Sequence, residues 1–402
     1  MLAACLVHAA SAIKDFCIPM DIAIVGVGQT TPVRRSSKGI RQLAIEAVQL
    51  ALDDAGIAAS DVDAIITDGV IMPHTVPREF IAAQFGIERR FDGGNSFGGV
   101  GVACAPELAK LAINAGKAHT VLFYFGVDWG SRASGPYGFH DMYPAKMAFE
   151  KPYGFNAQPS YFALWARRYM HEYGMTDADL AAVAISHRDN ALLNPSAQGR
   201  TPMTLESYRA ARMIASPLRV PDCCLISDGV GAFIMTSVER ARDMRQPPVR
   251  VLASSFASEP WSGDDIFTQQ PEIFRVTGAQ SACQRALREA RITIADVDFA
   301  ELYDCFTISV LMQLEDLGFC ARGESPAFVR DRGIGIHGGL PVNTHGGLLS
   351  YSYLLGVEHV IEAVRQLRGA AGAAQVSKAD IGLIGGWSIP DYGVLLLGKD
   401  HR

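Results

Sequence analysis

An internal repeat constrains the fold of this chain more than any other feature of its sequence. Residues 44–63 read AIEAVQLALDDAGIAASDVD and residues 279–298 read AQSACQRALREARITIADVD, at a constant spacing of 235 positions. Ten of these twenty positions are identical. Each copy has the apolar spacing of a helix, then a short connection, then the start of a strand. The sequence therefore predicts two copies of one α/β unit, because a repeat of this kind encodes the same supersecondary unit twice.

Helical and strand-like segments alternate around this repeat. The short apolar segments at 21–27, 63–67 and 120–125 predict buried strands, and the segments at 40–55 and 96–115 predict helices. Strand and helix in alternation indicate an α/β fold with parallel sheets.

The predicted domain organisation follows from where the alternation of strands and helices continues and where it is interrupted. Residues 127–202 interrupt the alternation with a stretch rich in Gly, Tyr, Phe, Pro and Met, which indicates an insertion of the kind that often covers a site. We expect an N-terminal half at 20–126 and 203–247, a loop insertion at 127–202 and a C-terminal half at 248–402. Residues 1–19 are expected to form a disordered extension outside the fold.

The composition excludes several classes of protein. A net charge of −6 and the lack of a basic run argue against a general nucleic-acid-binding protein. The eight cysteines form no C-x-x-C pair, so neither a zinc motif nor a redox motif is indicated, and reduced thiols in a cytoplasmic protein are expected. The N-terminal segment lacks the early positive charge of a signal peptide, and we expect no membrane span.

The stretch VNTHGGLLSYSYLLG at 342–356 is the first candidate for a functional site. Its adjacent glycines predict a sharp turn, and we expect a helix that runs from this turn through EHVIEAVRQLRG at 358–369. A helix N-terminus presents free N–H groups and a positive dipole end, which can hold negative charge on an oxygen. Tyr351 and Tyr353 fall in the first turn of this expected helix, where a hydrophobic core more often uses Leu or Ile.

The repeat also predicts what this turn faces. GNSFGG at 94–99 opens a helix in the first copy, as NTHGG at 343–347 does in the second. If the copies pack about a pseudo-two-fold axis, the two helix N-termini face each other. We expect the functional site between them.

Four motifs taken together resemble the thiolase superfamily. They are SHRDNALLNP at 186–195, ISDGVGAF at 226–233, ELYDCF at 301–306 and VNTHGG at 342–347. The resemblance covers about residues 20–400 and is nearest to the sterol-carrier-protein type of thiolase. It implies an α/β, duplicated thiolase fold with five αβαβα layers, two mostly parallel sheets and a loop insertion.

The chain departs from the thiolase pattern at each residue position that a thiolase uses to acylate itself. Ser96 stands at the position of the nucleophilic cysteine, where it would cap the first-half helix beside the substrate, and Cys104, two turns later, is expected to be core. Tyr353 replaces the histidine of Gly-His-Pro, and Tyr303 replaces that of His-Asp-Cys-Phe. The region GGWSIPD at 385–391 lacks the late catalytic cysteine. Since the Gly turn is retained, this pattern indicates a change of chemistry.

Such a pattern resembles the lipid-transfer-protein-type aldolases of bacterial steroid side-chain breakdown. The resemblance implies a retro-aldol lyase that cleaves a β-hydroxyacyl-CoA thioester of a steroid side chain into a ketone and propionyl-CoA or a similar acyl-CoA. Tyr303 would act as base and Tyr353 as acid, once a helix end and an imidazole lower a tyrosine pKa from about 10.

The resemblance assigns the remaining site residues as well. His345 and the backbone N–H groups at Gly346 and Gly347 would hold the enolate, and Asn343 would contact the same oxygen or cap the turn. Asp304 would orient the turn or bind a water. No metal and no cofactor are implied, since CoA is part of the substrate.

Other functions stay open at the level of sequence. One is an acyl-CoA acyltransferase or thiolase with another nucleophile, and another is a non-catalytic subunit that binds acyl-CoA or a lipid. The resemblance further implies a homodimer formed through the sheet of the N-terminal half and a small OB-fold, zinc-ribbon partner subunit.

Overall fold

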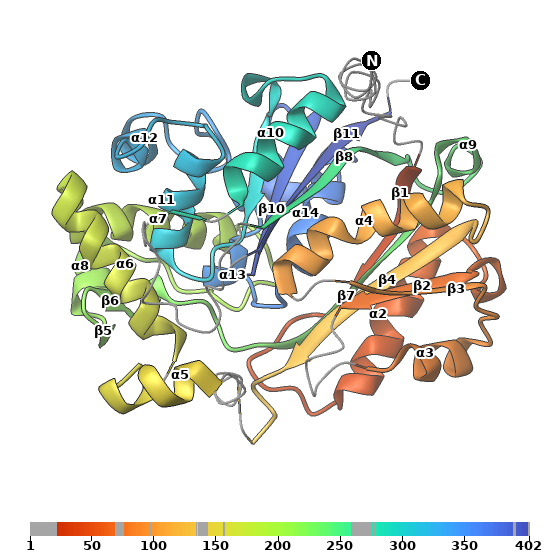
Figure 1. Cartoon of the computed structure of the whole chain (residues 1–402), viewed down its shortest axis with the longest axis horizontal. Coiled ribbons are helices and arrows are strands. Elements are labelled where there is room, and N and C mark those ends of the chain that lie inside the picture. The colour runs from red at the N-terminus through yellow and green to blue at the C-terminus, as the bar shows by residue number, and fades with distance from the viewer. Residues whose placement is uncertain are drawn as a thin grey trace, which may run out of the picture.

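The computed structural model describes residues 22–68, 76–95, 98–133, 135, 144–155, 157–258, 275–276, 278–388 and 391–400. Figure 1 shows these residues as stacked layers of strands and helices, with most of the N-terminal half in red to orange and most of the C-terminal half in cyan to blue. The predicted extension at 1–19 lies outside the described residues.

The N-terminal half has the predicted alternation of strands and helices. Its elements are β1 (Ile22–Gln29), α2 (Ile40–Ala55), η1 (Ala59–Asp61), β2 (Ala64–Asp68), α3 (Arg78–Phe85), β3 (Phe91–Asn95), α4 (Gly98–Asn114), β4 (Thr120–Asp128), β7 (Asp228–Ser237) and α9 (Val238–Ala241). Helix α2 has the predicted bounds, because a buried stripe that includes Ala47, Val48 and Ala51 faces the sheet and Gly56 ends the helix at a φ of 71°.

The C-terminal half repeats this arrangement. Its elements are β8 (Val249–Ser258), α10 (Ala279–Ala290), η6 (Ile294–Asp296), β9 (Phe299–Leu302), α11 (Thr307–Asp316), α12 (Ser325–Asp331), α13 (Gly347–Ser350), α14 (Val357–Leu367), η7 (Gly372–Ala374), β10 (Ile381–Ser388) and β11 (Asp391–Lys399). The starts of η1 and η6, at 59 and 294, and of β2 and β9, at 64 and 299, are each 235 residues apart. The predicted duplication is therefore confirmed.

Five layers build the molecule, as the αβαβα prediction requires. Helices α2 and α3 cover the outer face of the N-terminal strands, and α10 covers the outer face of the C-terminal strands. Helices α4 and α14 contact each other in the middle layer, and each contacts strands of both halves. Because α14 is enclosed on both sides, nearly all of its residues are buried.

The two strand layers are joined edge to edge into one continuous sheet, where two separate sheets were predicted. Its nine strands have the order β3-β2-β4-β7-β1-β8-β11-β10-β9, and a short pairing of Ala23 and Ile24 with Arg250 and Val249 joins the halves. Strand directions are more mixed than expected: β2 is parallel to β3 and β4, β9 is parallel to β10, and the other neighbours are antiparallel. One reason is that only two residues separate β10 from β11, and so short a connection permits antiparallel pairing only.

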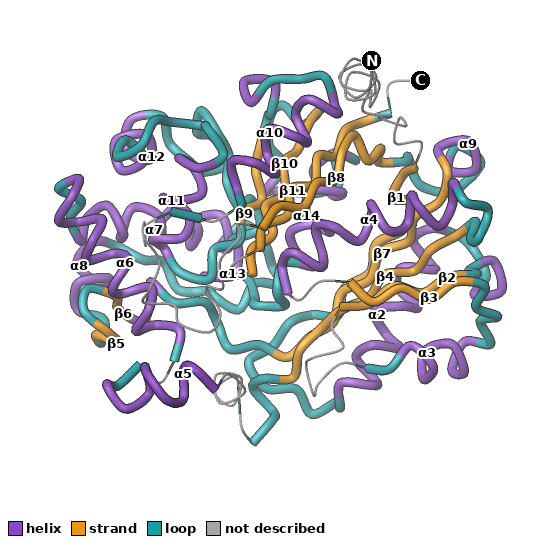
Figure 2. Tube along the Cα trace, viewed as in Figure 1, coloured by secondary structure: helices purple, strands orange, loops and turns teal. Residues whose placement is uncertain are grey.

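The region between β4 and β7 packs on the C-terminal half. It contains α5 (Pro144–Phe149), η3 (Lys151–Tyr153), α6 (Gln158–Tyr173), α7 (Asp177–Leu192), α8 (Leu205–Ala210), β5 (Met213–Ala215), β6 (Leu218–Arg219) and η4 (Val220–Asp222). Helix α7 contacts α11, α12 and α13, and Figure 2 shows these helices side by side. The predicted boundaries of the insertion stay a prediction.

The segment after the Gly turn is not the single helix predicted for it. Helix α13 ends at Ser350 and α14 begins at Val357, so Tyr351 and Tyr353 lie in the connection between them. Leu355 and Gly356 adopt positive φ angles of 58° and 94°, which an α-helix does not accept. The prediction was wrong because tertiary contacts compete with helical hydrogen bonds here: the N–H of Tyr353 donates to the Ser227 hydroxyl at 2.9 Å.

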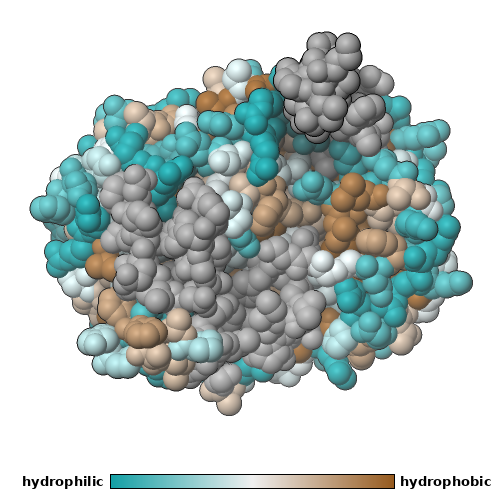
Figure 3. All heavy atoms as spheres, in the orientation of Figure 1, coloured by the Kyte–Doolittle hydropathy of each residue, from teal (hydrophilic) through white to brown (hydrophobic). Residues whose placement is uncertain are grey.

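The surface is mostly hydrophilic on the face shown in Figure 3, where hydrophobic side chains gather over α4. Leu111 of α4 is 59% exposed. Within the described ranges, no helix has the length and apolar character needed to cross a membrane.

Candidate active site

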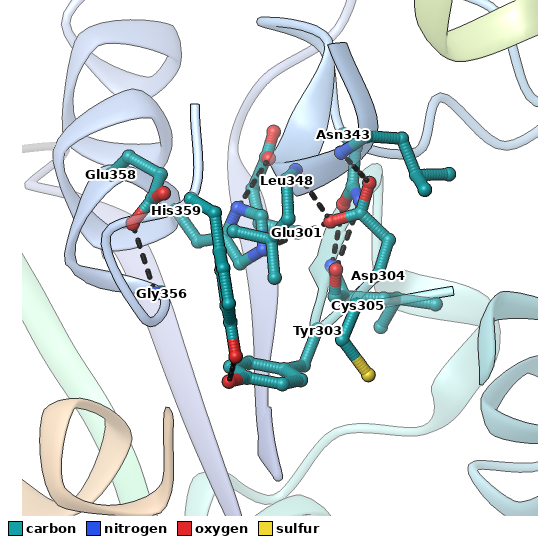
Figure 4. A network of polar contacts seen from close by, with 12 residues as sticks. Glu301, Tyr303, Asp304, Cys305, Asn343, Leu348, Gly356, Glu358 and His359 are labelled. Carbon is teal, nitrogen blue, oxygen red and sulfur yellow. Dashed lines mark hydrogen bonds and ion pairs between the residues drawn. The ribbon is translucent and has the colours of Figure 1, made fainter. Parts of the chain in front are cut away.

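Two tyrosines from distant parts of the chain meet at the end of β9. Tyr303 directly follows this strand, and Tyr353 lies in the connection between α13 and α14. Their hydroxyl oxygens are 2.8 Å apart, and their rings meet edge to face with centroids 6.2 Å apart. Tyr303 is buried and Tyr353 is half-buried. The expectation that these tyrosines face one another is confirmed, and Figure 4 shows the contact at Tyr303.

The N-termini of two helices meet beside this pair. A Cβ atom on Gly356, which precedes α14, would lie 3.6 Å from Cα of Gly99 in the first turn of α4 and 3.6 Å from Cδ2 of Tyr303. A Cβ atom on Gly99 would lie 2.5 Å from the same ring carbon, so this close packing requires glycine. Two helix N-termini do meet here, but the second is that of α14 and not that of the helix that follows NTHGG, so this part of the prediction was wrong. Both positive dipole ends lie next to Tyr303.

One further aromatic ring packs on the tyrosine pair, and three other aromatic rings pack on one another. The ring of Trp129, just after β4, lies 4.8 Å from that of Tyr353 between centroids. Phe306 stacks on Phe162 of α6 at 4.2 Å, and Phe162 also contacts the ring of Trp387 in β10 at 5.5 Å. Trp129 therefore gives Tyr353 an apolar neighbour on one side.

Burial raises the pKa of both tyrosines. For Tyr303, loss of hydration is the main cause, and the neighbouring oxygen of Tyr353 adds to it. For Tyr353, loss of hydration is again the main cause, followed by the thiols of Cys224 and Cys305. The pKa of each tyrosine therefore lies well above its usual value of about 10. This corrects the expectation of a lowered tyrosine pKa, because desolvation outweighs the helix dipoles.

The raised pKa values predict that neither tyrosine is ionised in the free protein at neutral pH. In a spectrophotometric titration, the tyrosinate absorbance of the Tyr303→Phe and Tyr353→Phe variants should match that of the unsubstituted chain below about pH 10. Each variant lacks one hydroxyl group, and in the unsubstituted chain that group is still protonated in this range. The control is the same titration of the unfolded chains, in which every tyrosine is hydrated. There, each variant should show the absorbance change of one ionising tyrosine fewer than the unsubstituted chain. A tyrosinate signal near neutral pH that disappears in either variant would contradict the prediction.

Asp304 is the centre of a buried hydrogen-bond network, shown in Figure 4. Its carboxylate accepts the backbone N–H groups of Leu348 at 2.8 Å and Leu349 at 3.2 Å, both in α13. It also contacts Nδ1 of His187 at 2.9 Å, from α7, and Nε2 of His359 at 3.4 Å, from α14. Burial acts to raise the pKa of this carboxyl group, but the hydrogen bond with His187 and the contact with the His359 imidazole outweigh it and hold the pKa below its ordinary value. These contacts orient the turn, as was expected of Asp304.

The Asn-Thr-His-Gly-Gly turn uses its polar groups for internal contacts. The Asn343 side chain accepts the N–H of Leu302 at 2.6 Å and donates to its carbonyl at 2.9 Å. Gly346 has a φ of 109°, and a Cβ atom on Gly347 would collide with the Asp304 carboxylate. The N–H groups that follow the glycines bind Asp304 and are not free for an oxyanion. The N–H of Gly346 likewise donates to the Asn343 carbonyl at 2.8 Å, so one of the two N–H groups expected to hold the enolate already has an internal acceptor.

One group within the described ranges could offer ligands to a metal ion, namely Glu301, His345 and His359. Nδ1 of His345 lies 3.1 Å from Oε2 of Glu301, and Nδ1 of His359 lies 3.7 Å from the same oxygen. The other oxygen of Glu301 accepts the Thr344 hydroxyl at 2.8 Å. A catalytic metal site keeps a position open to substrate, and these fully buried side chains offer none.

His345 belongs to this buried group and not to the tyrosine pair. Its ring packs on those of Tyr351 and His359, with centroids 4.9 and 5.2 Å away. Burial lowers the pKa of His345 to about 3, so the imidazole is neutral. Its expected contact with an enolate does not fit this position, because the side chain is enclosed between β9 and α14.

Two sequence candidates remain, and three residues of the buried network were not among the candidates. Ser96 lies outside the described residues, so its capping role stays a prediction. Cys104 is core, as predicted, and burial raises the pKa of its thiol to about 12. Sequence reasoning assigned none of His187, Glu301 and His359 to the site. His187 and Glu301 belong to motifs that had been singled out, whereas no sequence signal marked His359.

Comparison with known proteins identifies the family. A protein of Thermomonospora curvata named "Steroid side-chain-cleaving aldolase" is 36% identical over 393 residues, which cover 96% of this chain and 99% of that protein. A Mycobacterium tuberculosis protein named "17-hydroxy-3-oxo-4-pregnene-20-carboxyl-CoA lyase" is 35% identical, with coverage of 93% and 98%. A family model described as "Thiolase C-terminal domain-like" matches residues 262–390. The chain belongs to the thiolase superfamily.

Solved structures of the thiolase superfamily agree with this membership. The structure named "Ltp2-ChsH2(DUF35) aldolase" is 35% identical, has a TM-score of 0.89, and covers 96% of this chain and 100% of its own. A monomeric SCP2-thiolase-like protein of Mycobacterium smegmatis, 22% identical with a TM-score of 0.71, shares the fold. The resemblance to thiolase-like aldolases is thereby confirmed.

Proposed function

We propose that this member of the thiolase superfamily is a carbon–carbon lyase. It cleaves a β-hydroxyacyl-CoA thioester of a steroid side chain by a retro-aldol reaction into a ketone and propionyl-CoA, or a similar acyl-CoA. The observation that carries this proposal is the contact of the Tyr303 and Tyr353 hydroxyls, 2.8 Å apart, beside two helix N-termini. Two relatives that match 96% and 93% of this chain are named for a steroid side-chain aldolase and a steroid carboxyl-CoA lyase.

The reaction moves one proton from the β-hydroxyl group to the α-carbon of the substrate. As the hydroxyl group loses its proton, its oxygen becomes the ketone carbonyl, and the electron pair of the Cα–Cβ bond stays on Cα as an enolate. Because both tyrosines are protonated at rest, we assign them a proton relay. Tyr303 accepts the hydroxyl proton and passes its own proton to Tyr353, which protonates Cα. No atoms are gained or lost, and neither residue has to exist as a free tyrosinate.

The enolate places negative charge on the thioester oxygen. We propose that the N-terminal ends of α4 and α14, which meet beside Tyr303, stabilise this charge in place of the Gly turn. Ser96, two residues before α4, is proposed to cap that helix beside the substrate. The apolar ring of Trp129, which packs on Tyr353, is proposed to contact the steroid nucleus.

The remaining predicted site residues have a supporting role in this proposal. They hold the two tyrosine-bearing segments in place and do not contact the substrate. This group consists of Asn343, Gly346, Gly347, His345 and Asp304.

The name of a solved relative and the edge of the sheet support a proposal for the subunits with which this chain assembles. CoA enters as part of the substrate, and no separate cofactor takes part. Because the solved relative is named as a pair of proteins, Ltp2 and ChsH2(DUF35), we propose a small partner subunit of the OB-fold, zinc-ribbon kind. Strand β3 ends the sheet in the described part of the chain and is the proposed edge of a homodimer. The proposed location is the cytoplasm.

The test is an assay of the chain co-purified with its partner from the native host. With a steroid β-hydroxyacyl-CoA, a lyase releases ketone and short acyl-CoA in equal amounts, and the mass of the intact protein does not change. An acyltransferase or thiolase would retain an acyl group after incubation with an acyl-CoA, and a binding subunit would bind the thioester without product. The absence of ketone from the intact complex would exclude the lyase.

A further inference from the structure

His359 lies between the two segments that carry the tyrosines. Its Nε2 contacts Oδ1 of Asp304, the residue after Tyr303, at 3.4 Å. His359 is also the third residue of α14, the helix that begins four residues after Tyr353. The side chains of His359 and Asp304 are fully buried, so water does not compete for this contact.

The connection that carries Tyr353 is tied to the first turn of α14. The Glu358 carboxylate accepts the N–H groups of Leu354 at 2.6 Å and of Gly356 at 2.9 Å. The N–H of His359 itself donates to the Gly356 carbonyl at 3.1 Å. The backbone after Tyr353 therefore moves together with the helix turn that contains His359.

Asp304 holds both ends of this connection. On the side before Tyr353, its carboxylate accepts two backbone N–H groups of α13. On the side after Tyr353, its contact is the imidazole of His359. Figure 4 shows Asp304, Leu348 and His359 close together in this network. Without His359, only one end of the connection would be fixed to the residue that follows Tyr303.

We propose that His359 is a positioning residue that sets the distance between the Tyr303 and Tyr353 hydroxyls through its Nε2 contact with Asp304. This inference rests on the proposed lyase function. A proton relay across 2.8 Å tolerates little displacement, since a 1 Å shift of a catalytic group can cost about 100-fold in rate. His359 does not touch the substrate in this assignment, so its loss lowers kcat and leaves KM nearly unchanged.

Two conservative substitutions separate this role from simple filling of the core. The amide nitrogen of glutamine reaches the position of Nε2 in histidine, whereas that of asparagine reaches the position of Nδ1. His359→Gln therefore keeps a donor toward Asp304, and His359→Asn keeps one only toward Glu301, which lies 3.7 Å from Nδ1. We expect kcat within about 5-fold of the unsubstituted complex for His359→Gln and about 100-fold lower for His359→Asn, both with KM within about 3-fold. His171→Gln and His171→Asn, at an exposed position of α6, are the controls and should not differ.

A second measurement does not depend on turnover. Crystal structures of the two variants should show the hydroxyl–hydroxyl contact kept in His359→Gln and lengthened in His359→Asn. Equal kcat values for the two folded variants, or an unchanged contact in His359→Asn, overturn the proposal. An unsubstituted complex that yields no ketone overturns the lyase function instead, so the two failures are distinguishable.

Discussion

Phenylalanine in place of Tyr303 or Tyr353 is expected to lower the kcat of retro-aldol cleavage by about 1,000-fold, within the range known for general acid–base groups. Each substitution removes one hydroxyl group of the relay and leaves the aromatic ring in place. KM should therefore change little. Because the two hydroxyls act as a unit, the double variant should be no slower than the slower single variant. The measurement is steady-state kinetics of the complex with its partner.

Tyr351→Phe is the matched control for these substitutions. Tyr351 lies in the same connection, but it is 2% exposed and its ring packs on His345, away from the hydroxyl pair. Its variant should retain kcat within about 3-fold, since it removes no part of the proposed proton relay. Circular dichroism should show all variants folded, because one lost hydrogen bond costs about 1 kcal/mol. Near-normal turnover by a folded Tyr303→Phe or Tyr353→Phe variant would contradict the proposed proton relay.

The substitution Asp304→Asn is expected to lower the free energy of unfolding by about 3 kcal/mol or more, as the loss of one partner in a buried ion pair does. The carboxylate accepts two backbone N–H groups of α13 and contacts His187 and His359, all without exposure to solvent. An amide nitrogen in place of one carboxylate oxygen would face donors and could not accept from them. Urea unfolding at neutral pH measures the effect through the midpoint.

Glu172→Gln provides the comparison for this prediction. Glu172 pairs with Arg168 at 2.6 Å on the surface of α6, with side chains 36% and 50% exposed. Such an exposed pair contributes less than about 1 kcal/mol, so neutralising it should shift the midpoint only slightly. Similar shifts for Asp304→Asn and Glu172→Gln would show that the buried network does not stabilise the fold.

Much of the fold could be predicted from local patterns. The bounds of α2 were predicted because its apolar spacing and Gly56 are both local signals. The spacing of 235 residues recurs in the starts of β2 and β9, since a repeated sequence encodes a repeated unit. The joining of the halves into one sheet was not predicted, because the pairing of β1 with β8 depends on residues more than 200 positions apart, as Ile24 and Val249 are.

The candidate site could be predicted only in part. The positions of Tyr303 and Tyr353 followed from motifs that place a thiolase's catalytic groups in one pocket, and their hydroxyls do meet. The direction of their pKa shifts was not predicted, since burial is a property of the packed molecule. The Gly turn was assigned to an oxyanion because no local signal showed that the N–H of Gly346 and those of Leu348 and Leu349 have internal acceptors.

The sequence by itself determined the duplicated α/β architecture, the family and the two tyrosines, because each depends on residue identity and spacing. Only the tertiary structure decided that α13 and α14 are separate helices, that the tyrosines are protonated at rest, and that His359 reaches Asp304. The physical reason is the same in each case. Solvent exclusion and contacts between distant segments set the preferred hydrogen-bond partners and protonation states, and neither can be read from a local stretch of chain.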